Sequence, residues 1–337
     1  MVDVLVTGGA GFIGSNFVRY ALAQHLDWRV TTLDKLTYAG RLENLESLKD
    51  DPRHRFVKGD VADAAVAAPL VAAADIVVHF AAETHVDRSI QNAGEFITTD
   101  VYGTFVLLEA ARTSARLRRF VQISTDEVYG SVASGSSVET DELRPRNPYS
   151  ASKAGADRLA YSYWATYKVP VVITRASNNY GPNQFPEKII PLFITNLIDD
   201  IPVPLYGDGQ HERDWLHVED HCRAVDLLIE EGHPGEVYNV GGGNQVKNVD
   251  LTHRILDLAG KPVSLIRPVA DRQGHDRRYS LDTAKLESLG WRPRHDFQRG
   301  LAETVAWYRE NEAWWRPIKD QDPAFRTYYQ AQYGKRS

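Results

Sequence analysis

Cysteine is almost absent from this sequence, which holds Cys222 and no other thiol among its 337 residues. A single cysteine excludes an internal disulfide and is typical of proteins from a reducing compartment. No apolar run approaches the roughly 18 residues that a membrane-spanning helix needs. An apolar, strand-like run begins too close to Met1 for a signal peptide. We therefore expect a cytoplasmic protein without a membrane span.

An excess of basic charge is also lacking. The 39 Lys and Arg residues stand against 45 Asp and Glu residues, which gives a formal net charge of −6. This balance offers no electrostatic reason to expect binding to nucleic acid or to an anionic membrane. Hydrophobic residues make up 43% of the chain and charged residues 25%, which argues against extensive disorder. We expect a folded protein whose partner is a small molecule.

A glycine-rich turn follows the first apolar run. Gly8, Gly11 and Gly14 stand between that run and a helical pattern. Glycines at this spacing permit a tight turn and let the backbone approach a pyrophosphate at a helix N-terminus. A second apolar run ends in Asp34, which can bind a ribose diol and would repel a 2′-phosphate. The pattern predicts NAD as the cofactor, with Lys35 as the one charge that does not favour this choice.

Two further predicted strands end in residues that suit a cofactor. One is followed by Asp60, which could contact an adenine edge, and the other leads into Ala81 and Ala82, whose small side chains leave room for a ligand. Ligands of open parallel sheets bind at the carboxyl ends of the strands. Asp60 could equally be a loop residue with no ligand.

Strand-like runs alternate with helical stretches as far as about residue 175. This alternation predicts an α/β fold with a Rossmann-type, doubly wound parallel sheet. Proline and glycine then become frequent, which indicates shorter elements and loops that cover a site. We predict a cofactor-binding domain over residues 1–175, its sheet completed by segments near 210–242. A smaller mixed α/β substrate-binding domain over residues 176–337 interleaves with it.

Tyr149 and Lys153 are four positions apart, so both side chains project from one face of a helix. A phenol with its ordinary pKa of about 10 is a poor base at neutral pH. We expect the ammonium of Lys153 to lower the pKa of Tyr149 and so to make it a base for an alcohol.

Thr125, Asp126 and Glu127 directly follow another apolar run. Environment can push the pKa values of two adjacent carboxyls apart, giving one proton donor and one base. Removal of water from a sugar needs both groups in addition to a base for the alcohol, whereas a plain dehydrogenase needs one base. The alternative is that Asp126 and Glu127 begin a helix or form a solvated turn.

Cationic and amide side chains in the second half suit a nucleotide diphosphate, because guanidinium forks match phosphate oxygens. These candidates are Lys188, Arg213, Arg272, Arg277, Arg278, Asn178, Asn179 and Asn248. Each of them alone could instead be a solvated surface residue. His217, Glu219 and His221 have a spacing that could form part of a metal site, but no further ligand is evident, and we predict no metal.

Nearly the whole chain resembles the dTDP-glucose 4,6-dehydratases, extended short-chain dehydrogenases/reductases that convert a dTDP-hexose to its 4-keto-6-deoxy form. The resemblance rests on the segments Thr7 to Gly14, Asp34 to Gly40, His85 to Ser89, Ser124 to Gly130, Tyr149 to Lys153, Asn178 to Pro182, Glu187 to Pro191, Arg213 to Trp215 and Gly274 to Asp276. It implies that Tyr149 takes the proton of the 4-hydroxyl while Thr125 bonds the forming carbonyl oxygen. It further implies that Glu127 removes the C5 proton and that Asp126 protonates the departing 6-hydroxyl.

The resemblance also implies which residues contact each ligand. Around a tightly bound NAD these are Gly8, Gly11, Phe12, Ile13, Gly14, Asp34, Lys35, Thr37, Asp60, Val61, Ala81, Ala82, Thr99, Tyr149, Lys153 and Asn179. Around the nucleotide sugar they are Thr84, His85, Thr125, Asn178, Lys188, Pro204, Tyr206, Arg213, Asn248, Arg272 and His275. A homodimer built on helices near residues 100–115 and 150–167 is expected on the same ground.

Two alternatives remain open. A related epimerase or decarboxylase of a UDP-linked sugar would also use Tyr149 and Lys153, and the adjacent Asp126 and Glu127 argue against it. A non-catalytic dinucleotide sensor on the same fold is disfavoured by the intact Tyr149 and Lys153. Sugars linked to dTDP and to UDP both remain candidate substrates.

Overall fold

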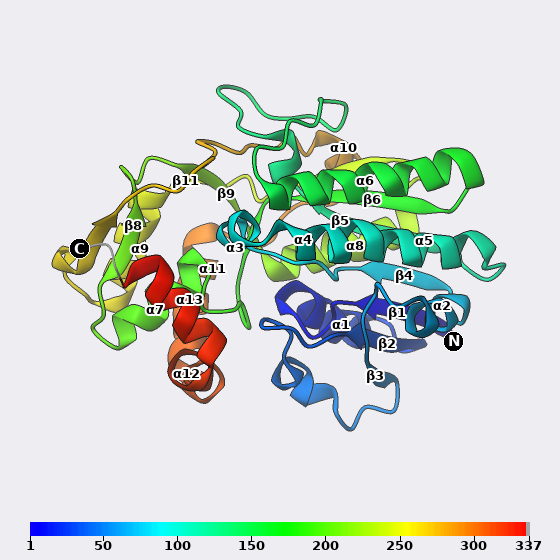
Figure 1. Cartoon of the computed structure of the whole chain (residues 1–337), viewed down its shortest axis with the longest axis horizontal. Coiled ribbons are helices and arrows are strands. Elements are labelled where there is room, and N and C mark those ends of the chain that lie inside the picture. The colour runs from blue at the N-terminus through cyan, green and yellow to red at the C-terminus, as the bar shows by residue number, and fades with distance from the viewer. Residues whose placement is uncertain (335–337) are drawn as a thin grey trace.

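The computed structural model describes residues 1–334, and its largest element is a seven-stranded sheet (Figure 1). The strands lie in the order β3-β2-β1-β4-β5-β6-β10, and every neighbouring pair is parallel. They are β1 (Val2–Thr7), β2 (Trp28–Asp34), β3 (His54–Lys58), β4 (Ile76–His79), β5 (Arg119–Thr125), β6 (Val171–Ala176) and β10 (Val237–Val240). The predicted doubly wound parallel sheet is confirmed.

Strand β1 shows why the sheet is covered on both faces. Side chains alternate along a strand, so Val4 and Val6 point to one face and Leu5 to the other. All three are at most 2% exposed, as expected for a strand buried on both sides. The strand order reverses at β1, which lies between β2 and β4. Such a reversal opens a crevice beyond the carboxyl ends of the strands.

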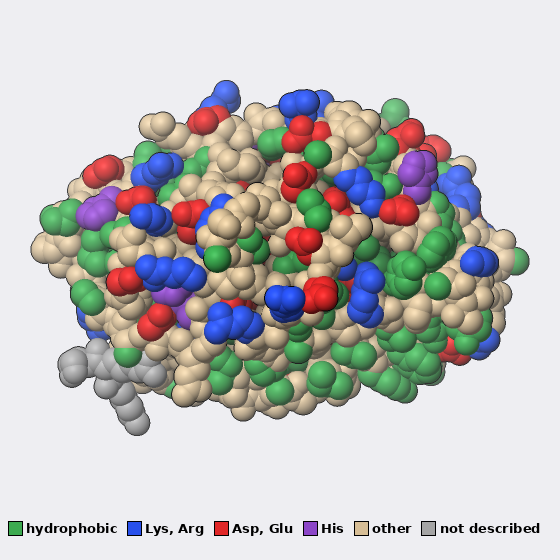
Figure 2. Space-filling model, turned by 90° about the horizontal axis from the view of Figure 1, so that it is seen from above, with side chains coloured by type: hydrophobic (Ala, Val, Ile, Leu, Met, Phe, Trp, Pro, Cys, Tyr) green, Lys and Arg blue, Asp and Glu red, His purple; other side chains and the backbone are tan. Residues whose placement is uncertain are grey.

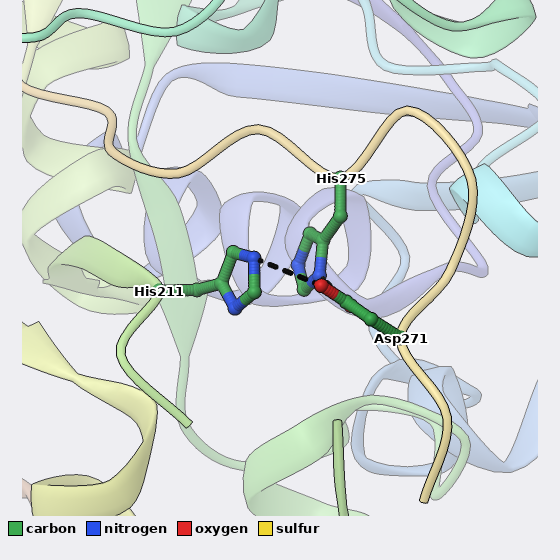
Figure 3. Close-up of side chains that lie close together, drawn as sticks. All are labelled: His211, Asp271 and His275. Atoms are coloured by element: carbon green, nitrogen blue, oxygen red, sulfur yellow. Dashed lines mark hydrogen bonds and ion pairs between the residues drawn. The ribbon is translucent and has the colours of Figure 1, made fainter. Parts of the chain in front are cut away.

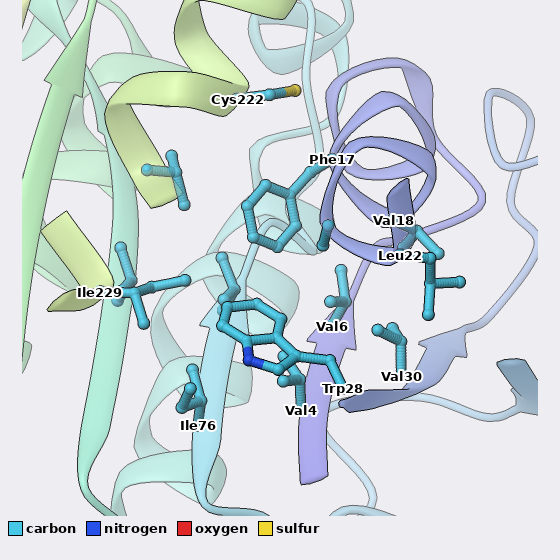
Figure 4. Packing of buried hydrophobic residues seen from close by; sticks show 14 of the residues in the cluster. Val4, Val6, Phe17, Val18, Leu22, Trp28, Val30, Ile76, Cys222 and Ile229 are labelled. Atoms are coloured by element: carbon cyan, nitrogen blue, oxygen red, sulfur yellow. The ribbon is translucent and has the colours of Figure 1, made fainter. Parts of the chain in front are cut away.

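Helices pack on each face of this sheet. Figure 4 shows one of the two cores, in which Phe17 of α1 and Ile229 of α8 pack with Val6 and Trp28 of the sheet. On the other face, α2, α5 and α6 cover Leu5 and its neighbours. These helices are α1 (Phe12–Gln24), α2 (Ala64–Ala72), α5 (Gly103–Thr113), α6 (Pro148–Tyr167) and α8 (Val218–Glu231).

Short helical turns lie in the connections of the large sheet. They are η1 (Leu42–Leu48), α3 (Val86–Gln91), α4 (Ala93–Phe96), η2 (Ile97–Tyr102) and η3 (Asp126–Tyr129). The turn η2 is π-helical and runs directly into α5. Turns of this type are rare and are frequent at functional sites.

The remaining elements form a second region, which lies on the left in Figure 1. Its strands are β7 (Asn178–Tyr180), β8 (Val203–Tyr206), β9 (Glu212–His217), β11 (Gln245–Lys247) and β12 (Ile266–Val269). Its helices are α7 (Ile189–Ile198), α9 (Asn248–Ala259), η4 (Val263–Leu265), α11 (Phe297–Glu310), α12 (Glu312–Gln321) and α13 (Pro323–Tyr333), and α10 (Ala284–Ser288) lies beside β10. A separate hydrophobic core holds this region together, with Trp315 fully buried in it.

The segments near 210–242 divide between the two regions. Strand β10 is the edge strand of the large sheet beside β6, whereas β9 pairs with β7 and β11 in a small sheet of its own. The chain thus returns to the first region after entering the second. The domain boundaries themselves stay a prediction. Among residues 1–334, no helix combines the length and the apolar character that crossing a membrane requires.

Candidate active site

One cavity of about 420 Å³ is lined by every residue that the resemblance assigns to catalysis, to the cofactor or to the nucleotide sugar. Its walls come from the glycine-rich turn after β1, the ends of β4 and β5, the first turns of α6, and β8. The sequence patterns, which lie far apart along the chain, therefore converge on a single site.

The glycine-rich turn has the shape that a closely approaching ligand requires. Gly8 has φ of +69°, and a Cβ there would lie 2.5 Å from the backbone nitrogen of Ala81. A Cβ on Gly14 would lie 2.3 Å from the carbonyl oxygen of Gly8. Helix α1 begins after Gly11, and no side chain caps it. No side chain therefore occupies the first N–H groups of α1, which can bind the pyrophosphate of NAD in the cavity.

The acidic residue after β2 is held in place by the backbone. Asp34 accepts hydrogen bonds from the N–H groups of Ala10, at 2.9 Å, and Leu36, at 2.8 Å. The neighbouring Lys35 pairs with Asp60 at 2.7 Å. Its charge is balanced within the cavity wall, so Lys35 no longer argues for a 2′-phosphate. The surroundings of Asp34 fit NAD, as the sequence predicts.

Asp126 is a candidate proton donor. Asp126 is 3% exposed, and its Oδ1 accepts a hydrogen bond from the Thr125 hydroxyl at 3.1 Å. Its Oδ2 makes no hydrogen bond with any residue of the described chain. Burial, followed by the charges of Glu127 and Asp214, raises the pKa of Asp126 well above its usual range. A carboxyl that stays protonated at neutral pH can serve as a general acid.

Glu127 lies in a different environment from its neighbour. Its Oε2 accepts a hydrogen bond from Ser150 at 3.3 Å and lies 3.5 Å from the hydroxyl of Tyr279. These two hydroxyl contacts hold the carboxyl of Glu127 in place at the wall of the cavity. The two residues do begin the short helix η3, which Thr125 caps by accepting from the Glu127 N–H at 3.3 Å. Both nevertheless line the cavity.

The expected effect of Lys153 on Tyr149 is wrong for this structure. The ammonium of Lys153 donates to the carbonyl oxygen of Ile123 at 2.6 Å. Burial, then the charges of Glu127 and Asp100, raises the pKa of Tyr149 well above its usual value. Spacing along a helix predicts which side chains are neighbours but not how deeply they are buried, and desolvation dominates here.

Asp100 is a buried carboxyl beneath the site that the sequence analysis missed. It lies in the π-helical turn η2, where its two oxygens accept from the Ser152 hydroxyl at 2.6 Å and the Glu83 N–H at 2.8 Å. Burial raises the pKa of Asp100 to about 7, although the charge of Lys153 opposes the shift. An isolated aspartate within a helical pattern carries no sequence signal of such a position.

Cations and unpartnered polar atoms gather in the part of the cavity that the second region lines. Lys188, Arg213 and Arg272 all line it, and burial lowers the pKa values of Lys188 and Arg213. Within residues 1–334, Asn178 Oδ1, Asn248 Oδ1 and Arg272 Nε are buried without a hydrogen-bond partner. Buried polar groups without partners are rare, so these atoms indicate a polar ligand.

Two of the arginines proposed for the diphosphate lie elsewhere. Arg277 forms an exposed ion pair with Asp208 at 2.8 Å, and Arg278 pairs with Glu212 at 2.8 Å. Neither side chain lines the cavity. Both residues directly follow the turn that carries Arg272, and their guanidinium groups made them candidates.

Histidines next to the site are stacked, as Figure 3 shows for His211 and His275. Their ring centroids are 3.6 Å apart with planes 13° from parallel, and His275 Nδ1 lies 2.6 Å from Asp271 Oδ1. A ring nitrogen binds a metal along a direction in its own ring plane. Two rings stacked face to face cannot both aim at one ion, so this trio is not assigned to a metal.

The second group of possible metal ligands differs from the one noted in the sequence and also contains two stacked histidines. The possible ligand atoms of His217 and Glu219 lie close to those of His295, and His221 is not part of this group. The rings of His217 and His295 stack at 3.8 Å. His221 instead places its Nδ1 3.0 Å from Asn179 Oδ1, beside the cavity. Stacking again opposes a shared metal ion.

Comparison with known proteins gives the same assignment as the geometry. A family model described as GDP-mannose 4,6 dehydratase matches residues 5–304. A dTDP-glucose 4,6-dehydratase of Streptomyces antibioticus is 56% identical over 324 residues, which cover 94% of this chain and 96% of that protein. The chain belongs to the dTDP-glucose 4,6-dehydratase family.

Solved structures support membership of this family. The dTDP-glucose 4,6-dehydratase DesIV of Streptomyces venezuelae, solved with NAD bound, is similar with a TM-score of 0.92 and 53% identity, covering 94% of this chain and all of that one. A UDP-glucose 4-epimerase of Thermus thermophilus, also in complex with NAD, is more distant, with a TM-score of 0.85 and 31% identity over 92% of this chain and 99% of that one. The same fold therefore occurs in enzymes with different reactions, and the fold alone does not identify the reaction.

Proposed function

We propose that this chain is an NAD-dependent dTDP-glucose 4,6-dehydratase, which converts dTDP-glucose to dTDP-4-keto-6-deoxyglucose. The observation that carries the proposal is the pair Asp126 and Glu127, which lies in one cavity with Thr125, Tyr149 and Lys153. Burial holds the proton on Asp126, while hydroxyl groups face the carboxylate of Glu127. An epimerase would need no such pair of acid and base.

The first proton transfer concerns the sugar 4-hydroxyl. Tyr149 is the base for this proton, and the hydroxyl of Thr125 bonds the oxygen as it becomes a carbonyl. Lys153 lies on the same face of α6 as Tyr149 and is held by its hydrogen bond to the carbonyl oxygen of Ile123. It brings a positive charge to this face of the helix. Bound NAD⁺ supplies a hydride acceptor for C4, a hydride donor for C6 and a positive charge that favours the phenolate of Tyr149.

Elimination then follows from the two carboxyl groups. A ketone at C4 makes the C5 proton acidic, and Glu127 can remove it. Asp126 gives its proton to the 6-hydroxyl, which leaves as water. Glu127 later returns a proton to C5. At the end of the cycle Glu127 is back in its starting form, Asp126 has lost one proton and Tyr149 has gained one. Proton exchange with solvent restores Asp126 and Tyr149.

A product assay tests the proposed function. Purified protein is incubated with dTDP-glucose and, separately, with UDP-glucose, and the 4-keto-6-deoxy product is measured by mass and by its absorbance in alkali. We expect product from dTDP-glucose without added oxidant. A protein with full NAD content that converts neither sugar would contradict the proposal, and faster turnover of UDP-glucose would reassign the nucleotide. Asp126→Asn provides the matched inactive control.

We also propose that the enzyme is a homodimer. Ile97, Tyr102, Phe105, Tyr161 and Tyr167, on or next to α5 and α6, are each at least 38% exposed. Figure 2 shows hydrophobic side chains gathered toward the lower right, the end of the molecule where α5 and α6 lie in Figure 1. Apolar surface of this kind marks an interaction site, and a second copy would cover it. Light scattering of the wild type should give twice the chain mass, and Phe105→Glu should lower the measured mass. A wild type with the mass of one chain would contradict the dimer.

A cytoplasmic location is proposed on separate grounds. The lone cysteine Cys222 is buried and unpaired, which suits a reducing compartment. Cell fractionation should recover the protein with cytoplasmic markers, and recovery with membranes would contradict this proposal.

A further inference from the structure

Asp87 is a buried carboxyl in the cavity wall that is satisfied mainly by neutral donors. It lies on α3 and is 5% exposed. Its Oδ2 accepts from the hydroxyls of Tyr206, at 3.2 Å, and Tyr328, at 3.3 Å, and from the amide of Gln332 at 3.4 Å. The guanidinium of Arg272 lies 3.8 Å from its Oδ1.

Two of these donors come from the C-terminal helix α13. Tyr328 and Gln332 are four residues apart, so they share one face of the helix. Gln332 also donates to the Tyr206 hydroxyl at 2.5 Å, and Tyr333 of the same helix lines the cavity. The backbone oxygen of Tyr333 accepts from Arg267 at 2.9 Å, which anchors the helix end to β12.

This network has a consequence for Arg272. A buried carboxylate is costly unless its oxygens are hydrogen-bonded. The donors from α13 therefore satisfy the carboxyl of Asp87 and hold it in place, 3.8 Å from the guanidinium of Arg272. Arg272 keeps a buried Nε without a partner in the described chain, so it remains able to bond an incoming anion.

We propose that helix α13 is part of the nucleotide subsite: Tyr328 and Gln332 act through Asp87 to position Arg272 and Tyr206 for a nucleoside diphosphate. Tyr328, Gln332 and Asp87 are positioning residues in this account, and Arg272 and Tyr206 are the residues that touch the ligand. The inference rests on the proposed function, because that function supplies a nucleoside diphosphate as part of the substrate.

Binding of dTDP to the NAD-loaded enzyme tests the inference without turnover. In isothermal titration, Tyr328→Phe and Gln332→Leu should each weaken dTDP binding by roughly 5- to 20-fold, which is about the value of one ordinary hydrogen bond, because the lost bond acts on dTDP only through Asp87. With dTDP-glucose, KM should rise more than kcat falls, and NAD content should not change. The double variant Asp87→Asn, Tyr328→Phe should lose less dTDP-binding free energy than the sum of the losses in the two single variants, because both residues act through one carboxyl.

Tyr329→Phe is the matched control. Tyr329 lies on the same helix, but its hydroxyl accepts from Asn196 at 3.1 Å and makes no bond to Asp87. The control should bind dTDP as the wild type does. Equal weakening in Tyr329→Phe would show a general packing effect and overturn the inference. Unchanged dTDP affinity in both Tyr328→Phe and Gln332→Leu would overturn it as well. A wild type that binds dTDP but converts no sugar would refute the proposed function alone.

Discussion

Replacing Asp100 with Asn should change the pH dependence of stability. The carboxyl is 1% exposed and has a raised pKa of about 7 in the folded protein, against an ordinary value of 3.8. An amide can keep both contacts, since its oxygen can accept from the Glu83 N–H and its nitrogen can donate to the Ser152 hydroxyl. The substitution thus removes a titrating group with little change in shape.

The sign and size follow from the two pKa values. Below pH 4 both folded and unfolded chains hold the proton on Asp100, so its ionisation costs nothing. As the pH rises from about 4 to about 7, the unfolded chain releases the proton while the folded chain retains it, and the folded state loses stability. A difference of roughly 3 units, at about 1.4 kcal/mol per unit, amounts to about 4 kcal/mol. Above pH 7 this loss of unfolding free energy is constant, and it is absent from the Asn variant, which has no carboxyl to ionise.

Urea unfolding of wild type and Asp100→Asn at pH 5 and pH 8, with equal NAD content, measures the effect. The free energy of unfolding of the variant, relative to wild type, should rise by about 3 kcal/mol between these pH values. Asp50→Asn, at an exposed aspartate, is the control and should show no such change. A difference between Asp100→Asn and wild type that does not vary with pH would refute the reasoning about burial.

Further predictions concern the reaction. Asp126→Asn should still oxidise C4 but slow elimination by a factor of about 10² to 10⁴, as loss of a general acid does. Absorbance of NADH reports C4 oxidation, and a loss of oxidation as large as the loss of elimination would contradict the role of Asp126. Glu127→Gln should spare oxidation and suppress entry of solvent deuterium at C5, which NMR of the recovered sugar reports. Tyr149→Phe should remove most C4 oxidation, and full activity would mean that another residue is the base. Sugar deuterated at C4 should give product deuterated at C6, and crossover of label between molecules in a mixed incubation would refute a closed cycle.

The candidate site residues whose grouping the sequence could predict are those related by local spacing. Gly8, Gly11 and Gly14 act within one turn, and Tyr149 and Lys153 within one turn of a helix. Such residues keep their relation in any structure that forms the local element. Alternating strands and helices likewise predicted the parallel sheet, because each strand needs both faces covered.

The parts that were missed depend on contacts between distant segments. Tyr279 reaches Glu127 across 152 positions, and Tyr328 reaches Asp87 across 241. No spacing rule relates residues so far apart. The pKa of Tyr149 was predicted in the wrong direction for a similar reason, since its acidic neighbours and its burial come from β5, η3 and η2 and not from its own helix.

The charges of the cavity connect substrate binding with acid catalysis. The positive charge of Arg213 lowers the pKa of Asp126, while burial and Glu127 raise it by more. On the proposed function, the diphosphate of the substrate binds among Lys188, Arg213 and Arg272 and offsets their charge. The lowering effect on Asp126 then weakens, and the carboxyl holds its proton more firmly once the sugar is in place. The bound diphosphate thus helps to keep the acid protonated until the 6-hydroxyl departs.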